Sequence, residues 1–159
     1  MLGLGKYFFT FVCLSFLFSC EKSPSQVVQK PQILQVGLSQ LPKSLDPRKV
    51  KDSTSSMLAR MLFEGLTRIG PEGEIVPSLA DNIEVSSDRR TYTFHIKDAY
   101  WSDGKPITAY DFVNSWMTAL DPEFESPLSH YLFVIDHAKD AKGGDISLDQ
   151  IGAFAVDDK

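Results

Sequence analysis

Hydrophobic and polar residues follow two regular periods between Tyr92 and Pro122. In the first part every second residue is hydrophobic, at Tyr92, Phe94 and Ile96. Alternation of this kind is typical of a strand with one buried face. In the second part hydrophobic residues recur every four positions, at Phe112, Trp116 and Leu120. This spacing predicts a helix that buries an aromatic face and ends near Asp121, because proline disfavours the helical conformation of the residue before it.

The segment between this strand and this helix has the residues of a turn and of a helix start. The run Ser102–Pro106 contains a glycine, which can adopt a positive φ, and ends in a proline, which fixes its own φ. Thr108 lies three residues before Asp111, in a variant of the capping box. The sequence therefore predicts a strand, a turn and a helix in this order.

The same periods and the positions of turn residues predict further elements. In chain order these are a strand at Gln32 to Ser39, a helix at Ser55 to Phe63, a turn at Gly70 to Gly73, a strand at Asn82 to Ser86, and a helix from Leu128 to Lys142. Gly65 is expected to end the first helix by adopting a positive φ, and Gly143-Gly144 is expected to end the second.

Residues 1–19 have the pattern of a secretory signal peptide. Lys6 supplies a positive charge, and Tyr7 to Phe18 is an uncharged, mostly hydrophobic run that is short for a membrane-spanning helix. The run Leu17-Phe18-Ser19-Cys20 resembles a bacterial lipobox. We therefore expect cleavage before Cys20 and lipidation of its thiol, with a buried free cysteine or a short uncleaved anchor as alternatives. The polar residues 20–31 predict a flexible tether.

Composition and charge narrow the class of protein. A chain of 159 residues with 43% hydrophobic residues fits a single domain. The net charge of -5 and the lack of lysine and arginine runs disfavour nucleic-acid binding. Cys13 lies in the hydrophobic N-terminal run, so cleavage would leave Cys20 as the only cysteine, and no internal disulfide is expected.

No arrangement of residues in the sequence argues for catalysis. It contains no Gly-x-Ser-x-Gly, no metalloprotease helix motif and no phosphate-binding glycine loop. His130 and His137 fall on about one helix face near two aspartates, but a solvated helix end is preferred over a metal site. We expect no catalytic residue, no metal and no cofactor, and a small hydrolase is retained only as a weaker alternative.

The strand, turn and helix described above resemble a signature of the dipeptide-, oligopeptide- and nickel-binding proteins of ABC importers. The shared pattern lies between Tyr92 and Trp116 and reads, in order, Tyr-Thr-Phe, a Trp-Ser-Asp-Gly turn, Pro-hydrophobic-Thr-Ala, Asp-Phe-Val and a Trp. Three shorter runs match the same family, at Leu45-Asp46-Pro47, Phe63-Glu64-Gly65-Leu66 and Ser126-Pro127. By itself, the first of these runs would indicate only a turn.

The resemblance implies an α+β fold over residues 32–159. This would be the N-terminal portion of a two-lobed periplasmic-binding-protein fold, with a mixed sheet and helices. It would comprise the start of lobe one and the small α/β subdomain, so that the chain is expected to be truncated. The implied function is peptide capture for ABC-type oligopeptide import. The alternative is a non-binding remnant that folds partly or needs a partner chain.

The resemblance also implies partners, a location and a ligand site. The partners would be oligopeptides and the permease and ATPase subunits of the importer, with lipid anchoring at the periplasmic side of the cell envelope. In the relatives, residues shortly after Leu-Asp-Pro approach the peptide through backbone groups, in the manner of strand addition. These positions fall at Lys51, Asp52 and Ser53. A compatible alternative is that Asp52 or Ser53 caps the following helix.

Overall fold

The computed structural model describes residues 32–159, so the expected signal peptide, lipidated Cys20 and tether lie outside the described residues. The chain divides into two units, 1–36 and 37–159. The second unit contains, in chain order, η2 (Pro47–Lys49), α2 (Ser53–Leu62), β1 (Thr67–Ile69), β2 (Ile75–Pro77), β3 (Ala80–Val85), β4 (Tyr92–Ile96), α3 (Ala109–Leu120), η3 (Ser129–Val134), α4 (Ala138–Gly143) and η4 (Leu148–Gln150), where η denotes a 3-10 helix. None of the helices in residues 32–159 has the length and hydrophobicity needed to cross a membrane.

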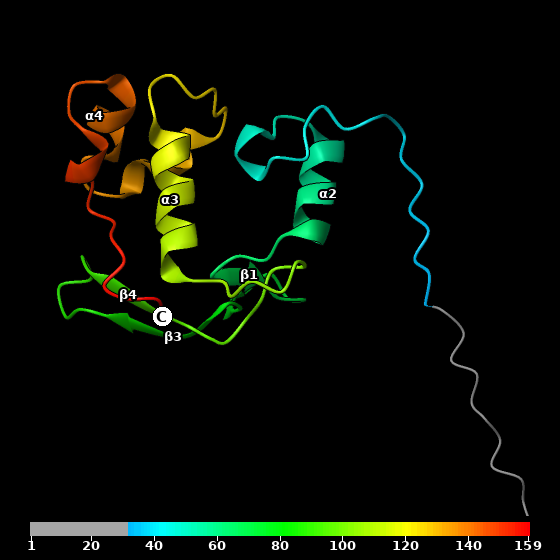
Figure 1. Cartoon of the computed structure of the whole chain (residues 1–159), viewed down its shortest axis with the longest axis horizontal. Helices are drawn as coiled ribbons and strands as arrows, with labels where there is room; N and C mark the ends of the chain where they lie inside the picture. Colours follow the sequence, from blue (N-terminus) through cyan, green and yellow to red (C-terminus); the bar gives the residue numbers. More distant parts are fainter. Residues whose placement is uncertain (1–31) are drawn as a thin grey trace, which may run out of the picture. The chain divides into compact units, whose positions relative to one another are not determined.

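The four strands form two separate antiparallel pairs. β1 pairs with β2, which places Ile69 opposite Ile75, and β3 pairs with β4, which places Ile83 opposite Phe94. The strands gather on one side of the second unit, with helices α2, α3 and α4 on the other (Figure 1). Helices with antiparallel strands agree with the expected α+β class, but residues 32–159 hold two hairpins where a mixed sheet was expected. Short turns join the strands of each pair, whereas a parallel neighbour needs a longer crossover.

The strand expected at Gln32 to Ser39 is absent from the structure. Residues 32–38 form neither helix nor strand, and the side chains of Ile33 and Leu34 are 73% and 78% exposed. Within the described residues this segment pairs with no strand, and a strand is stable only with a paired neighbour. Alternating hydrophobic residues were therefore not sufficient evidence for a strand here.

The strand expected from Tyr92 is confirmed as β4. Burial on its inner face is confined to the C-terminal half of the strand. Ile96 is 5% exposed, while Tyr92 is 54% exposed.

The turn that leads into β4 contains Arg89 with φ 58°, in the left-handed region. Asp88 supports this turn, because its Oδ1 accepts hydrogen bonds from the Ser86 hydroxyl at 2.6 Å and from the Arg90 backbone N–H at 3.1 Å.

We expect Arg89→Gly to raise the free energy of unfolding by about 0.5–1 kcal/mol. A side chain in the left-handed region costs about 1–2 kcal/mol, and the greater freedom of glycine in the unfolded chain offsets part of this gain. Arg90→Gly is the matched control, since it removes the same charge from a residue whose φ is not positive; it should lower the free energy of unfolding. Urea denaturation followed by tryptophan fluorescence measures both. Equal shifts in the two variants would show that the backbone of Arg89 is not strained.

Helix α2 starts earlier than expected and ends differently. It begins at Ser53, because Asp52 caps it, and Phe63 follows its last residue with an extended backbone (φ -121°, ψ 147°). Gly65 does not adopt the expected positive φ. Instead, its backbone comes close to that of Thr67, since a Cβ at Gly65 would lie 3.0 Å from the carbonyl oxygen of Thr67, which is a tight contact.

Helix α3 confirms the expected turn, helix start and helix end. Gly104 has φ 86°, as expected for the turn. The Thr108 backbone N–H donates to Asp111 Oδ2 at 2.8 Å, and both halves of the capping box are present. The helix ends at Leu120, just before the Asp121-Pro122 pair.

The prediction of a single helix from Leu128 to Lys142 is wrong, because this segment forms two helices, η3 and α4. The break lies at His137, whose φ of 59° no right-handed helix can contain. A tertiary contact accounts for the break: the Asp136 carbonyl accepts a hydrogen bond from the Gly152 N–H at 2.9 Å. The expected end of α4 is confirmed by Gly144, which has φ 81°.

The hydrophobic core of the helical part forms where α3, α4 and the segment after α4 meet. Its buried residues are Leu120, Ala138, Ala141 and Ile151. Leu120 and both alanines have no exposed surface. Because alanine is small, α4 can approach α3 closely, and Leu120 at the end of α3 is fully buried.

Candidate functional site

The three residues expected to bind a ligand form the junction between η2 and α2. Val50 is 5% exposed and extended (φ -66°, ψ 130°), and Asp52 is also extended (φ -131°, ψ 160°). Asp52 accepts hydrogen bonds from the Ser55 backbone N–H at 2.9 Å and the Ser55 hydroxyl at 2.7 Å, and these bonds lower the pKa of Asp52. The capping role considered for Asp52 is therefore confirmed, and the role of Lys51, Asp52 and Ser53 in ligand binding stays a prediction.

Lys51 leaves its backbone free for a partner. Its Nζ lies 3.2 Å from Glu125 Oε1, but both side chains are more than half exposed, so this pair contributes little stability. Within residues 32–159, the Lys51 backbone N–H and C=O form no hydrogen bond. Lys51 thus lies between two extended residues, Val50 and Asp52, with both of its own backbone groups free, and strand addition by a peptide requires free backbone groups of this kind.

Ser55 fixes the position of this junction. Its side chain has no exposed surface, and its Oγ accepts hydrogen bonds from the backbone N–H groups of Lys43 at 3.0 Å and Ser44 at 3.2 Å. The same hydroxyl donates to Asp52. One buried hydroxyl therefore joins the loop before η2 to the cap of α2.

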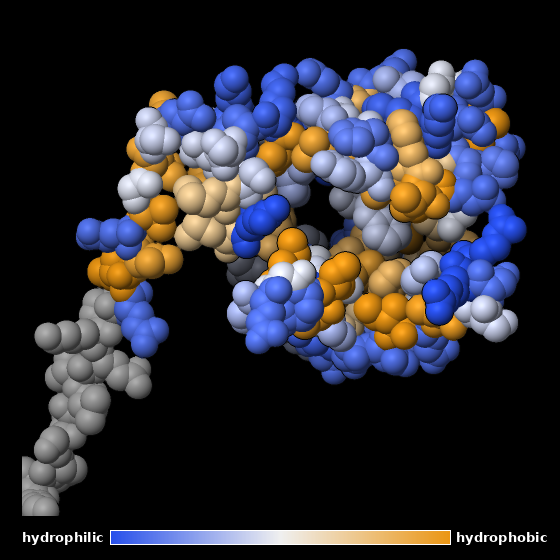
Figure 2. Space-filling view, turned by 180° about the vertical axis from the view of Figure 1, so that it is seen from behind, coloured by the Kyte–Doolittle hydropathy of each residue, from blue (hydrophilic) through white to orange (hydrophobic). Residues whose placement is uncertain are grey.

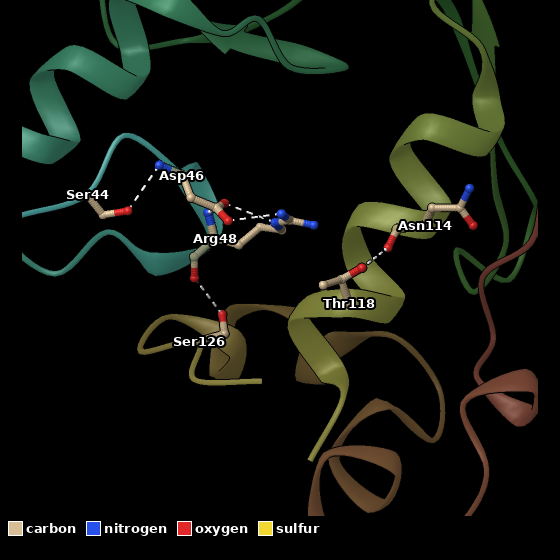
Figure 3. Close-up of polar contacts among 6 residues, drawn as sticks. All are labelled: Ser44, Asp46, Arg48, Asn114, Thr118 and Ser126. Atoms are coloured by element: carbon tan, nitrogen blue, oxygen red, sulfur yellow. Dashed lines mark hydrogen bonds and ion pairs between the residues drawn. The ribbon is translucent and has the colours of Figure 1, made fainter. Parts of the chain in front are cut away.

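Asp46, which precedes η2, and Arg48, which lies within it, are joined by several hydrogen bonds (Figure 3). Asp46 accepts hydrogen bonds from the Arg48 backbone N–H, Nε and Nη2, each at 2.9 Å. The guanidinium hydrogen bonds lower the pKa of Asp46. The Arg48 carbonyl accepts a hydrogen bond from Ser126 Oγ at 2.9 Å, and the Arg48 guanidinium lies 5.2 Å from the ring centre of Phe124. Arg48 thus connects the Leu45-Asp46-Pro47 motif to the Ser126-Pro127 motif, which are far apart in sequence.

Two open pockets flank Arg48. The first, of about 390 Å³, is lined by Asp46, Pro47, Arg48, Phe63, Trp101, Asp111, Asn114, Ser115 and Thr118. The second, which we name the Leu128 pocket, has about 300 Å³ and is lined by Pro47, Arg48, Ser115, Trp116, Ala119, Ser126, Leu128, Ser129, Tyr131 and Leu132. Lys51, Asp52 and Ser53 line neither pocket. Figure 2 shows one face of the molecule with an opening that both hydrophobic and hydrophilic residues surround.

The other ionisable residues considered in the sequence lie apart from these pockets. His137 Nε2 lies 3.8 Å from Asp136 Oδ2, and His137 Nδ1 lies 3.9 Å from Asp140 Oδ2. Residues 32–159 contain no group of three side chains that could hold a metal ion. Glu64 accepts a hydrogen bond from the Ser78 hydroxyl, which is a structural contact.

Sequence reasoning found the motifs around Arg48 but missed the residues that join them. Asp46 and Ser126 belong to recognised motifs, yet no local signal indicates that both contact Arg48. For Ser55, the sequence predicts only a position at the start of a helix. Its burial follows from a tertiary contact with the loop at Lys43, which no local pattern encodes.

Comparison with known proteins identifies the family. The model of the bacterial extracellular solute-binding proteins, family 5 (middle region), matches residues 74–159. The oligopeptide-binding protein OppA of Bacillus subtilis is 44% identical over 127 residues, which cover 79% of this chain and 23% of that protein.

Solved structures agree with this match. The oligopeptide-binding protein OppA of Haemophilus influenzae, in complex with the peptide RPPGFSPFR, superposes with a TM-score of 0.70 and 37% identity over 74% of this chain and 23% of its own. Listeria monocytogenes OppA bound to peptide gives a TM-score of 0.72 and 31% identity over 74% of this chain and 24% of its own.

These matches confirm the resemblance and the α+β fold expected from it. The matched part corresponds to the N-terminal portion of two-lobed binding proteins, and the chain spans about 23% of the length of these relatives. The signature between Tyr92 and Trp116 lies inside the matched residues 74–159. The chain belongs to the bacterial extracellular solute-binding proteins of family 5.

Proposed function

We propose that this chain contributes part of the peptide-binding site of an exported solute-binding protein that delivers oligopeptides to an ABC importer. The observation that carries this proposal is the backbone of Lys51, which is free of hydrogen bonds within residues 32–159 and follows a buried, extended residue. Membership of a solute-binding family supports it, as do relatives whose solved structures hold peptides.

The proposed chemistry is non-covalent capture. A peptide backbone would pair with the N–H and C=O of Lys51, as a strand pairs with the edge of a sheet. Such pairing depends on groups that every peptide has, so it suits a carrier of many sequences. No catalytic residue is needed, and the ATPase subunits of the importer, which are separate chains, would supply the energy of transport.

We expect the 159-residue chain alone to bind peptides weakly. Association costs at least about 4 kcal/mol in lost freedom of motion. In two-lobed binding proteins the ligand lies between the lobes, and the matched part is about 23% of such a protein. The assay must therefore detect weak and local contacts.

Nuclear magnetic resonance titration of the chain with a mixed-sequence peptide pool provides this test. We expect the amide signals of Lys51, Asp52 and Ser53 to shift. Lys51→Pro should weaken the binding by about fivefold to tenfold, because it removes one backbone donor worth about 1 kcal/mol. Val50 has the extended backbone that a following proline requires, so the fold should persist. Lys51→Ala is the control, since it removes the side chain and keeps the donor.

Each contrary result of this titration has a distinct meaning. If Lys51→Ala weakens binding as much as Lys51→Pro, the lysine side chain captures the ligand, and backbone pairing is wrong. If no amide shifts at any peptide concentration, the alternative of a chain that does not bind peptide without a partner is favoured. Hydrolysis of the peptides during the titration would revive the small hydrolase.

We further propose that Cys20 is lipidated and holds the protein at the outer side of the bacterial cytoplasmic membrane. The lipobox-like run at Leu17 to Cys20 supports this, together with the extracellular family and the periplasmic relatives. Metabolic labelling with radioactive palmitate should label the wild-type chain and fail to label Cys20→Ser. Cys13→Ser is the matched control and should keep the label. Equal labelling of the wild-type and Cys20→Ser chains would exclude Cys20 as the lipidated residue.

A further inference from the structure

The loop that follows α3, residues 121–126, is held against η2. Ser126 Oγ donates a hydrogen bond to the Arg48 carbonyl at 2.9 Å. The ring centre of Phe124 lies 5.2 Å from the Arg48 guanidinium and 4.7 Å from Lys49 Nζ, which is the range of cation–π attraction. The 121–126 loop therefore holds two of the three residues of η2.

The same loop supports the segment proposed to bind a peptide. Lys51 Nζ lies 3.2 Å from Glu125 Oε1, but this exposed pair is weak. The contacts of Ser126 and Phe124 act closer to the backbone, because η2 ends two residues before Lys51. The loop thus supports the backbone of Lys51 through η2 more than through the ion pair.

Lys142, in the last turn of α4, holds the 121–126 loop from the other side. Its Nζ donates hydrogen bonds to the backbone carbonyls of Asp121 and Phe124, at 2.7 Å each. In the part of the chain that the structure describes, the Phe124 carbonyl accepts no backbone hydrogen bond. Hydrogen bonds from an ionised donor are about twice as strong as neutral ones. The positive charge also lies at the C-terminal end of α3, where the helix dipole favours a cation.

The backbone of Lys142 is anchored in the hydrophobic core. Lys142 follows Ala141, which has no exposed surface and belongs to the same buried cluster as Leu120 at the end of α3. A core that is closely packed does not let this turn of α4 shift freely. Lys142 therefore connects the fixed core to the 121–126 loop.

We propose that Lys142 is a positioning residue for peptide capture: its ammonium group shapes the 121–126 loop, and the loop holds η2 and the Lys51 backbone in the conformation that accepts a peptide. The inference rests on the proposed peptide binding at Lys51. Lys142 lines neither of the pockets beside Arg48, so it acts through the loop and not by touching the ligand. When only a fraction of the chains has the binding conformation, the apparent affinity falls by that fraction.

The test is nuclear magnetic resonance titration of the full 159-residue chain with the mixed-sequence peptide pool. Lys142→Met removes the N–H donors and keeps a long side chain. It should weaken binding about tenfold, as when about a tenth of the chains keeps the binding conformation. Lys142→Arg keeps the charge and the donors and should retain most of the affinity. Lys139→Met is the matched control, because it removes the same charge from an exposed residue of α4 and should leave binding unchanged.

Two further readouts separate positioning from a general loss of stability. The amide signals of β4 should stay the same in Lys142→Met, while those of Phe124, Ser126 and Arg48 shift. Ser126→Ala breaks the bond between the loop and η2 without touching Lys142, and it should also weaken binding. In a Ser126→Ala background, Lys142→Met should cost less affinity than it does in the wild type, because residues that act through one another are not additive.

Equal affinities of the Lys142→Met and wild-type chains, with shifts at Lys51 to Ser53 in both, would overturn this inference and leave the proposed function standing. Equal losses in Lys142→Met and Lys139→Met would also overturn it, because the change in charge alone would account for them. Full additivity with Ser126→Ala would show that Lys142 does not act through the 121–126 loop. A wild-type chain that binds no peptide would overturn both proposals together.

Discussion

Replacing Leu120 by alanine is expected to lower the free energy of unfolding by about 2–5 kcal/mol, the usual cost of removing a fully buried leucine side chain. Leu120 has no exposed surface and packs with Ala138, Ala141 and Ile151. Because two of these neighbours are alanines, they cannot move side-chain atoms into the space that the substitution opens. Urea denaturation followed by tryptophan fluorescence is a direct measurement, since Trp116 lies one turn before Leu120 on α3.

Leu62→Ala is the matched control for this experiment. Leu62 is the last residue of α2, as Leu120 is of α3, but it is 62% exposed. The control should change the free energy of unfolding by less than about 1 kcal/mol. Similar losses in both variants would contradict the assignment of the core to the contact between α3 and α4.

Ser55→Ala is expected to lower the free energy of unfolding by about 1–3 kcal/mol, although it removes a single oxygen atom. That hydroxyl accepts hydrogen bonds from the backbone N–H groups of Lys43 and Ser44 and donates one to Asp52. Its loss leaves two backbone N–H donors and one carboxylate oxygen without this partner in a partly buried position, which is costly. The loop before η2 should become more mobile, which amide hydrogen exchange at Ser44 would report as faster exchange.

Ser56→Ala is the control for the loss of a serine hydroxyl. Ser56 is the next residue of α2, and within residues 32–159 its side chain forms no hydrogen bond. Its replacement should change the free energy of unfolding by less than about 0.5 kcal/mol. If hydrogen exchange at Ser44 were unchanged in Ser55→Ala, the buried hydroxyl would not hold the loop before η2.

The sequence predicted those elements in which the local signals agree. β4 and α3 were found because alternation, a turn with Gly104 and a capping box with Asp111 all lie within a few residues of each other. The same block identified the family, because many residues at fixed spacing rarely recur by chance. By contrast, the strand expected from Gln32 rested on alternation alone, and in the described residues this segment pairs with no strand.

The candidate site was predicted only in outline. The sequence placed Lys51, Asp52 and Ser53 through the resemblance, and the capping role of Asp52 followed from its residue type. The free backbone of Lys51 depends on the extended junction that Val50 and Ser55 hold in place. The Leu128 pocket depends on the contact between Arg48 and Ser126, which are 78 residues apart.

By itself, then, the sequence determined the short-range features of this protein: the turns, the helix caps, the period of β4 and α3, and membership of a solute-binding family. Only the tertiary structure decided where α4 begins and which polar groups meet at Arg48 and Ser55. The physical reason is the range of the interactions. A cap or a turn is formed by residues within four positions of each other, whereas the Asp136–Gly152 and Arg48–Ser126 contacts form only when distant segments pack together.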